Sequence, residues 1–196
     1  MVQIVNGVGN GNRMKVDETN RGFVRAIAED GTIEAAEDGN AYFLTSGAVS
    51  LTDAASNGVF YYKHEEDWDA IIDRIIFSAG ISTGGTTNLC TVTATINPTG
   101  MTSGSGSDLT AINNNFGSNN ALDVSSSEAG ATGASIAGGT TGPTFYWKDE
   151  ITTTFETAIV LRKGNSVGFS VAAPASNTSL GVAMTCNLHK ALTTGE

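Results

Sequence analysis

Short apolar runs, interrupted by Gly, Asn, Ser or Pro, follow one another along most of this chain of 196 residues. In the run at 89–97, threonines alternate with apolar side chains. Such alternation is typical of a half-buried strand, because successive strand side chains point to opposite faces of the sheet. β-Branched residues also lose less side-chain freedom in a sheet than in a helix. The pattern therefore predicts an all-β fold, either a sandwich or a barrel.

The segment from Trp68 to Ala79 fits two elements. Its apolar residues fall on one helical face, and the acidic residues before it suit the positive end of a helix dipole. Four isoleucines between 71 and 76, followed by a phenylalanine, also suit a central strand buried on both faces. We predict a strand here and keep the helix as the alternative.

The sequence IVLRKGNSVGFSV at 159–171 predicts a tight β-hairpin. Its β-branched runs flank Lys163, Gly164 and Asn165, and a Gly-Asn pair is what tight turns require. The acidic residues after VFYYKH at 59–64 are a second possible hairpin turn.

Three parts of the chain differ in composition. Residues 1–38 contain an Asn/Gly stretch and short apolar alternations, which predicts an extended N-terminal arm that becomes ordered on another surface. Residues 39–192 carry the strand patterns of a β-sandwich body, and 193–196 are a short tail. Within the body, Gly, Ser and Asn dominate 99–142, which predicts long loops over one face of the sandwich.

Charge is unevenly placed along the chain. The formal net charge is −10, yet four of the ten basic residues lie in the first twenty-five positions. These residues are Arg13, Lys15, Arg21 and Arg25. A basic arm on an acidic body predicts docking on an acidic protein surface, with ordinary solvated cations as the alternative interpretation. The acidic body argues against a nucleic-acid partner, since phosphates need a basic face.

Few side chains are suited to catalysis. The chain has two His and two Cys and matches no phosphate-binding, metal-binding or nucleophile motif, so we expect no enzyme activity, cofactor or metal site. Cys90 and Cys186 sit in apolar, strand-like contexts, which favours two buried free thiols over a disulfide. No apolar window is long enough for a transmembrane helix, and the start is not typical of a secretory signal, so we expect no membrane partner.

Titratable residues elsewhere have simpler explanations. The run from His64 to Asp73 is acidic but lacks the spacing of a calcium loop, so we interpret it as a solvated turn. His189 has no sequence partner and is expected at the surface. A glycosidase would need two carboxylates in one cleft. Asp149, Glu150 and Glu156 are available, but no pair among them stands out.

Three adjacent aromatic residues, Phe145, Tyr146 and Trp147, are the candidate ligand-binding side chains. They could form a platform on which a sugar stacks. Aromatic residues in a strand more often belong to the core, and we favour that interpretation.

The order of several segments resembles a group of small virion proteins of tailed bacteriophages, over about Val16 to Leu188. The segments are VDETNRGFVRAIAEDG, GNAYFLTSGAVSLT, VFYYKHEEDWDAIIDRIIFSAGISTGG, TATINPTG, NNNFGSNNALD and IVLRKGNSVGFSVAAPASNTSLGVAMTCNL. The resemblance implies an antiparallel, jelly-roll-like β-sandwich, made in the cytoplasm of the infected bacterium and incorporated into the virion.

Two functions are compatible with that resemblance. In the first, the chain is a capsid decoration or cement protein, a homotrimer that binds the major capsid protein on the outside of the assembled head. In the second, it is a tail, baseplate or fibre-tip module that recognises a host surface polysaccharide through the 99–142 loops and the three aromatic residues. Fibre proteins usually have a repetitive or coiled shaft, and this chain has neither heptads nor repeats, which favours decoration.

Overall fold

The computed structural model describes residues 31–52, 55–83, 89–102, 106–147, 150–172 and 179–191. The chain divides into two units, Met1–Asp30 and Gly31–Glu196, and all described residues belong to the second unit. Three features predicted from sequence lie outside the described residues. These are residues 1–30 of the extended arm, its four cations Arg13, Lys15, Arg21 and Arg25, and the tail at 193–196.

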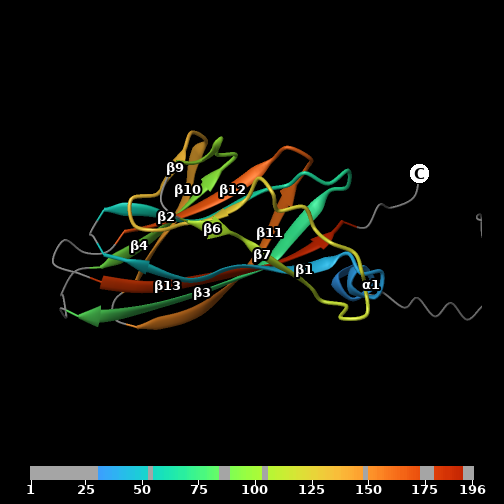
Figure 1. Cartoon of the computed structure of the whole chain (residues 1–196), viewed down its shortest axis with the longest axis horizontal. Helices are drawn as coiled ribbons and strands as arrows, with labels where there is room; N and C mark the ends of the chain where they lie inside the picture. The colour runs from blue at the N-terminus through green and yellow to red at the C-terminus, as the bar shows by residue number, and fades with distance from the viewer. Residues whose placement is uncertain are drawn as a thin grey trace, which may run out of the picture. The chain divides into compact units, whose positions relative to one another are not determined.

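The described part of the chain is an antiparallel β-sandwich with one short helix, as Figure 1 shows. The predicted all-β class and the sandwich are confirmed. The elements are α1 (Gly31–Glu37), β1 (Ala41–Leu51), β2 (Ser56–Lys63), β3 (Ala70–Thr83), β4 (Cys90–Ile96), β5 (Gly100–Thr102), β6 (Ser107–Asp108), β7 (Thr110–Asn113), β8 (Glu128–Ala129), β9 (Ser135–Ala137), β10 (Thr140–Trp147), β11 (Ile151–Leu161), β12 (Ser166–Ala172) and β13 (Ser179–Lys190).

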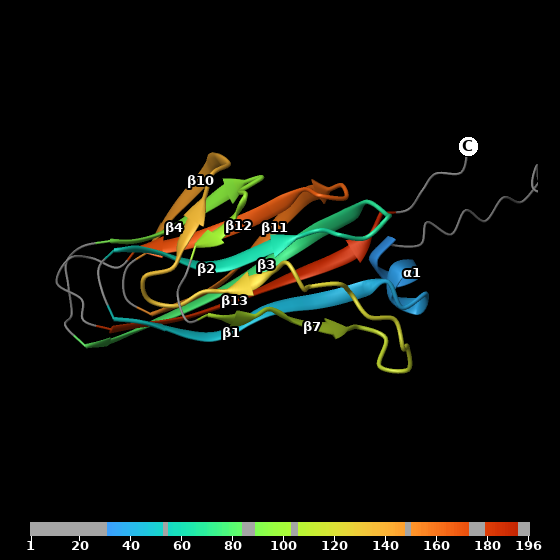
Figure 2. The same cartoon turned by 45° about the horizontal axis from the view of Figure 1, so that its top comes forward.

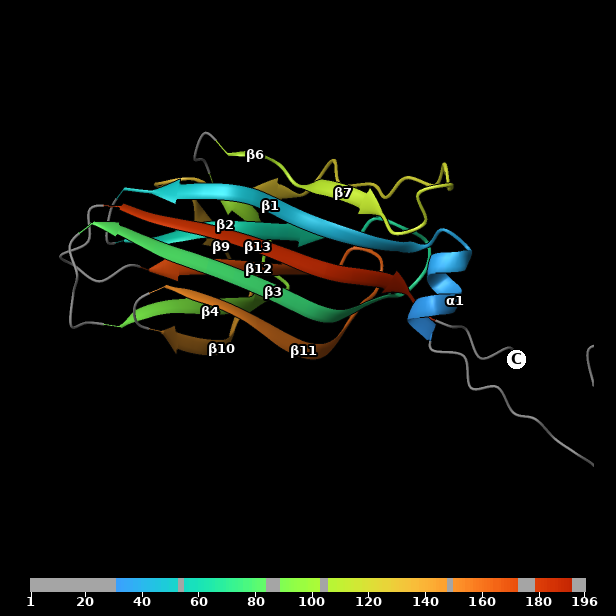
Figure 3. The same cartoon turned by 90° about the horizontal axis from the view of Figure 1, so that it is seen from below.

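Two sheets form the layers of the sandwich, with strand orders β11-β3-β13-β1-β7 and β10-β4-β12-β2-β8-β6. A separate pair of strands, β5 and β9, forms a third small sheet. Figure 3 shows β10 and β11 along one side of the sandwich and β6 and β7 along the other. Among the eight longer strands, each strand is followed along the chain by a strand of the opposite sheet, except that β4 is followed by β10.

The predicted hairpin at 159–171 is therefore wrong in its pairing, although its turn is present. Asn165 N donates to Arg162 O at 2.8 Å, and Gly164 has a φ of 82°. However, β11 pairs with β3, and β12 pairs with β2 and β4. The chain crosses between sheets here, and Leu161 and Val167 are buried in the common core. The suggested turn between β2 and β3 likewise joins different sheets.

The strand predicted over 68–79 is confirmed as β3, a central strand between β11 and β13. Only one of its faces is fully buried: Ile72 and Ile75 lie in the core, whereas Ile71 and Ile76 are partly exposed. In a regular strand, side chains on the same face are two positions apart, so residues 72 and 75 could not both point inward. Asp73 is an extra residue relative to β13, and this bulge restores the inward direction.

The core lies between the sheets, with Phe60 of β2 packed edge-on against Phe169 of β12 at 5.9 Å between ring centroids. Both cysteines are free and buried, as predicted. Burial raises the pKa of the Cys186 thiol above its ordinary value of 9.0.

We expect this thiol to titrate only on unfolding. Because its pKa is raised in the folded state, its contribution to stability is complete below pH 9 and is lost as the pH rises further. Urea unfolding at pH 7.5 and pH 10 should show a fall in the free energy of unfolding, and Cys186→Ala should show a smaller fall. Native protein should also resist Ellman's reagent, and reaction at the rate of unfolded protein would contradict this prediction.

Residues 31–37 were expected to be part of an extended arm and instead form α1. Ala and Glu favour the helix, and a glycine ends it: Gly39 has a φ of 73°. Its N–H donates to Ala36 O at 3.0 Å, and Asn40 N donates to Ala35 O at 2.6 Å, which is a Schellman motif.

The prediction that His189 lies at the surface is wrong. Its neighbours Cys186 and Leu188 point into the core, but His189 itself points to the outer face of β13 and is still buried. Helix α1 contacts β13 and β1, as Figure 3 shows, and its Ala35 is also buried. The helix therefore covers this histidine, whose Nδ1 donates to Lys190 O at 3.1 Å.

The segment at 99–142 contributes short strands to both sheets. Strand β7 extends the first sheet beside β1, and β8 and β6 extend the second beyond β2. Strands β5 and β9 lie against β2, and β9 also contacts β12. Gly58 of β2 allows β5 to pack this closely, because a Cβ at Gly58 would lie 2.6 Å from the Met101 sulfur. Leu109 and Leu122 anchor the segment in the core.

Candidate functional site

The described residues contain no group of three or more His, Cys, Asp and Glu side chains placed to hold a metal ion. No helix in the described ranges is long and apolar enough to cross a membrane. The remaining candidates in the described residues are buried polar groups, exposed aromatic residues and cavities.

His64 is fully buried at the end of β2, and both of its ring nitrogens are engaged. The Tyr62 hydroxyl donates to Nδ1 at 2.9 Å, and Nε2 donates to the Trp68 carbonyl. Its ring also packs edge-on against Trp68, 4.8 Å between centroids. The interpretation as a solvated turn fits the exposed Asp67 but not His64, which is a structural residue that closes the turn.

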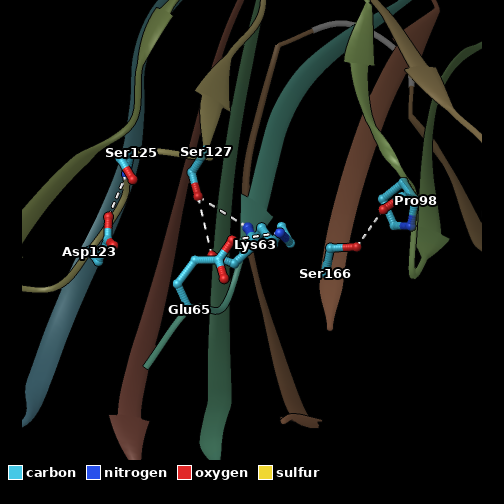
Figure 4. Close-up of polar contacts among 7 residues, drawn as sticks. All are labelled: Lys63, Glu65, Pro98, Asp123, Ser125, Ser127 and Ser166. Atoms are coloured by element: carbon cyan, nitrogen blue, oxygen red, sulfur yellow. Dashed lines mark hydrogen bonds and ion pairs between the residues drawn. The ribbon is translucent and has the colours of Figure 1, made fainter. Parts of the chain in front are cut away.

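Ion pairs hold this turn against the turn at 162–165. Lys163 Nζ lies 2.5 Å from Asp67 Oδ1, and this hydrogen bond lowers the pKa of the Asp67 carboxyl. Lys63 and Glu65 pair at 2.6 Å, and Ser127 Oγ accepts from Lys63 N at 3.1 Å (Figure 4). These are exposed or half-exposed contacts, which contribute little stability each. Their effect is to fix the end of the sandwich.

Glu150 and Glu156, the two described carboxylates among the sequence candidates, do not form a pair. Glu156 on β11 is exposed and bonded to Arg74 on β3, 3.1 Å from Nε to Oε1. Glu150 lies six positions earlier, and Asp149 is outside the described residues. Glu150 precedes β11 and Glu156 lies within it, and neither pocket of the described residues is lined by both.

The three candidate aromatic residues on β10 point in different directions. Trp147 is 5% exposed and packs edge-on against Phe77 of β3, at 5.0 Å between centroids. Phe145 packs against Phe155 of β11 at 4.4 Å. Tyr146 lies between them in sequence and is 65% exposed. Strand alternation thus turns Tyr146 outward and the other two inward, so the three rings do not form one stacking platform.

An apolar pocket of about 410 Å³ lies between the sheets. Its lining includes residues of β10 and β11, the edge strands of opposite sheets, and of the strands beside them, all of which Figure 2 labels. Its lining includes Ile96, Phe145, Phe155, Ile159 and Val160. None of its lining side chains is charged. We call this region, comprising β10, β11 and the last residues of β4, the open side.

Sequence reasoning missed most of the open side. Phe155 and Ile159 have the pattern of core residues but are only partly buried. These two positions face inward and stay partly exposed because β11 is the last strand of its sheet. Val160 is 56% exposed and pairs with Ile71, on the outer face of the sheet.

This arrangement offers apolar contact surface and free strand edges, which suit binding of another molecule. The groups needed for acid-base or nucleophilic chemistry are not gathered there. No family model, curated protein or solved structure matches the chain.

Proposed function

We propose that the chain is a structural protein of a tailed-bacteriophage virion, a capsid decoration or cement protein. In this proposal a homotrimer binds the major capsid protein on the outer surface of the assembled head. The protein is made in the cytoplasm of the host bacterium and joins the particle there. The order of sequence segments quoted above supports the phage assignment.

The observation that carries the proposal is the strand order. The order β11-β3-β13-β1 in one sheet faces β10-β4-β12-β2 in the other, and successive strands change sheets. This order supports the jelly-roll form of the sandwich, which occurs in viral capsid domains and in lectins. A fold hosts many functions, and here the strand order supports the virion role together with the quoted sequence segments.

Decoration requires binding energy and no chemistry. A protein that binds only the assembled lattice stabilises that state by RT ln(1 + [L]/Kd), about 2.7 kcal/mol per site when the free protein is at 100 times Kd. Summed over the sites on a head, this term resists disassembly. The described residues suit such a role, since they present a sandwich whose open side has an uncharged apolar pocket.

Polysaccharide recognition receives less support from the geometry. A stacking platform needs several exposed aromatic faces, but Trp147 is buried and Phe145 is packed on Phe155. Tyr146 is the one ring of the three that is mainly exposed.

The test is cryo-electron microscopy of the intact virion, with the chain fitted into the density. We expect density for three copies at local three-fold positions over the head. Density at the tail tip or on an appendage would overturn the decoration proposal and redirect attention to glycan binding. Purified heads without the protein should also lose their DNA at a lower temperature, and readdition of the protein should restore the original temperature.

A further inference from the structure

The two sides of the sandwich differ in how their sheet edges are protected. On one side the edge strands are β6 and β7, which have two and four residues. On the open side the edge strands are β10 and β11, with eight and eleven residues. Long edge strands expose unpaired backbone groups, and proteins usually shorten, charge or cover them.

Charge protects the open side very little. Strands β4 and β10 contain no charged residue, and β11 contains only Glu156, which is already paired with Arg74. Pro143 and a bulge interrupt the first half of β10, and a bulge follows Glu156 in β11. The regular stretch of β11 before that bulge keeps its outer backbone edge free of any strand in the described ranges.

Apolar side chains are exposed beside these edges. Ile96 at the end of β4 is 51% exposed, and Val160 on β11 is comparable. Phe145 and Phe155 pack on one another across the gap between the sheets and leave a pocket behind them. An uncharged apolar strip of this kind, bordered by polar surface, is typical of a protein interface.

We infer that the open side is the surface through which copies of this chain associate with one another. Two arguments select a second copy as the occupant. The first is electrostatic: copies with a formal net charge of −10 repel one another, and a contact through strands whose one charged residue, Glu156, is already paired with Arg74 brings few like charges together.

The second argument is area. Eleven residues of β11 span about 37 Å at about 3.4 Å per residue, and facing sheets lie about 10 Å apart. With the two edge strands included, the strip is about 20 Å wide and covers about 740 Å², close to the roughly 800 Å² per partner of a standard interface. Covering it would also bury the exposed faces of Ile96 and Val160.

This inference goes beyond the proposed function because it names the contact surface, and it does not depend on capsid binding. It is tested on the isolated full chain, so failure of self-association and failure of capsid binding are separate results. The variants are Val160→Glu and Ile96→Glu, both at exposed positions that a carboxylate can occupy in a monomer. The matched control is Ile112→Glu on β7, where the isoleucine is 44% exposed at the opposite side of the sandwich.

The measurement is mass by light scattering and native mass spectrometry over a concentration series. We expect the wild type and Ile112→Glu to form the same oligomer, and each open-side variant to raise the dissociation constant at least tenfold. Amide exchange should be slow in 151–156 of the wild type and faster in the open-side variants. Circular dichroism and thermal melting check that each variant is folded.

Three outcomes would overturn the inference. The first is a wild type that stays monomeric throughout the series. The second is dissociation of the Ile112→Glu variant while the open-side variants remain associated. The third is a monomer that carries a small apolar molecule in native mass spectrometry, which would make the pocket a ligand site.

Discussion

Gly130→Ala is expected to lower the free energy of unfolding by more than about 3 kcal/mol, or to prevent folding. A Cβ at this position would lie 1.7 Å from the carbonyl oxygen of Gly58, a backbone atom of β2 that cannot turn aside. Gly130 N also donates to Val59 O at 3.1 Å, so separating the two backbones would break a buried hydrogen bond.

Gly100→Ala is the matched control for this variant. Gly100 lies in β5, has no positive φ, and a Cβ there would meet no atom within 4 Å. Its free energy of unfolding should therefore change by less than about 0.5 kcal/mol. Urea unfolding of the three proteins, monitored by tryptophan fluorescence, measures both effects. Equal free energies of unfolding for the two variants would contradict this prediction, because the backbones at 130 and 58 would then have moved apart at little cost.

The contrast between these glycines explains why 99–142 was difficult to interpret from sequence. Both residues belong to a Gly- and Ser-rich segment that has the composition of a loop. Gly130 is required because a strand 72 positions earlier in the chain passes directly beside it. Local composition cannot distinguish a glycine that permits a turn from one that permits two backbones to approach.

Local periodicity predicted the strands whose alternation is regular. Strand β4 follows its sequence pattern, with Cys90 and Val92 buried and Thr91 and Thr93 less so. Strand β3 was predicted less clearly, because the bulge at Asp73 changes the inward register within it. A pattern of period two can identify a strand but not an extra residue that the neighbouring strand lacks.

Pairing was the part of the fold that sequence could not supply. The turn at 162–165 has the residues of a hairpin turn, but a turn of that kind also allows the next strand to enter the opposite sheet. The same limitation hid the candidate site. Phe155 has the pattern of a core residue, and it stays partly exposed because no strand in the described ranges covers the far edge of β11.

Reversing the four cations of the N-terminal segment is expected to reduce binding to undecorated heads at least 100-fold. The variant carries Arg13→Glu, Lys15→Glu, Arg21→Glu and Arg25→Glu. If these cations dock on an acidic capsid surface, the reversal replaces attraction with repulsion. It also makes the formal net charge eight units more negative than the present −10. A 100-fold loss corresponds to about 2.7 kcal/mol, well within reach of four charge contacts.

The control reverses two cations of the body, Arg162→Glu and Lys163→Glu, both exposed in the turn between β11 and β12. It makes the body more acidic but leaves the N-terminal segment unchanged, so it separates a local docking effect from general repulsion by net charge. Binding is measured by co-sedimentation with heads at several salt concentrations. Wild-type affinity should fall with salt, because exposed charge contacts are screened. If the fourfold variant saturates heads as the wild type does at low salt, the cations are ordinary surface residues, and docking must use the sandwich itself.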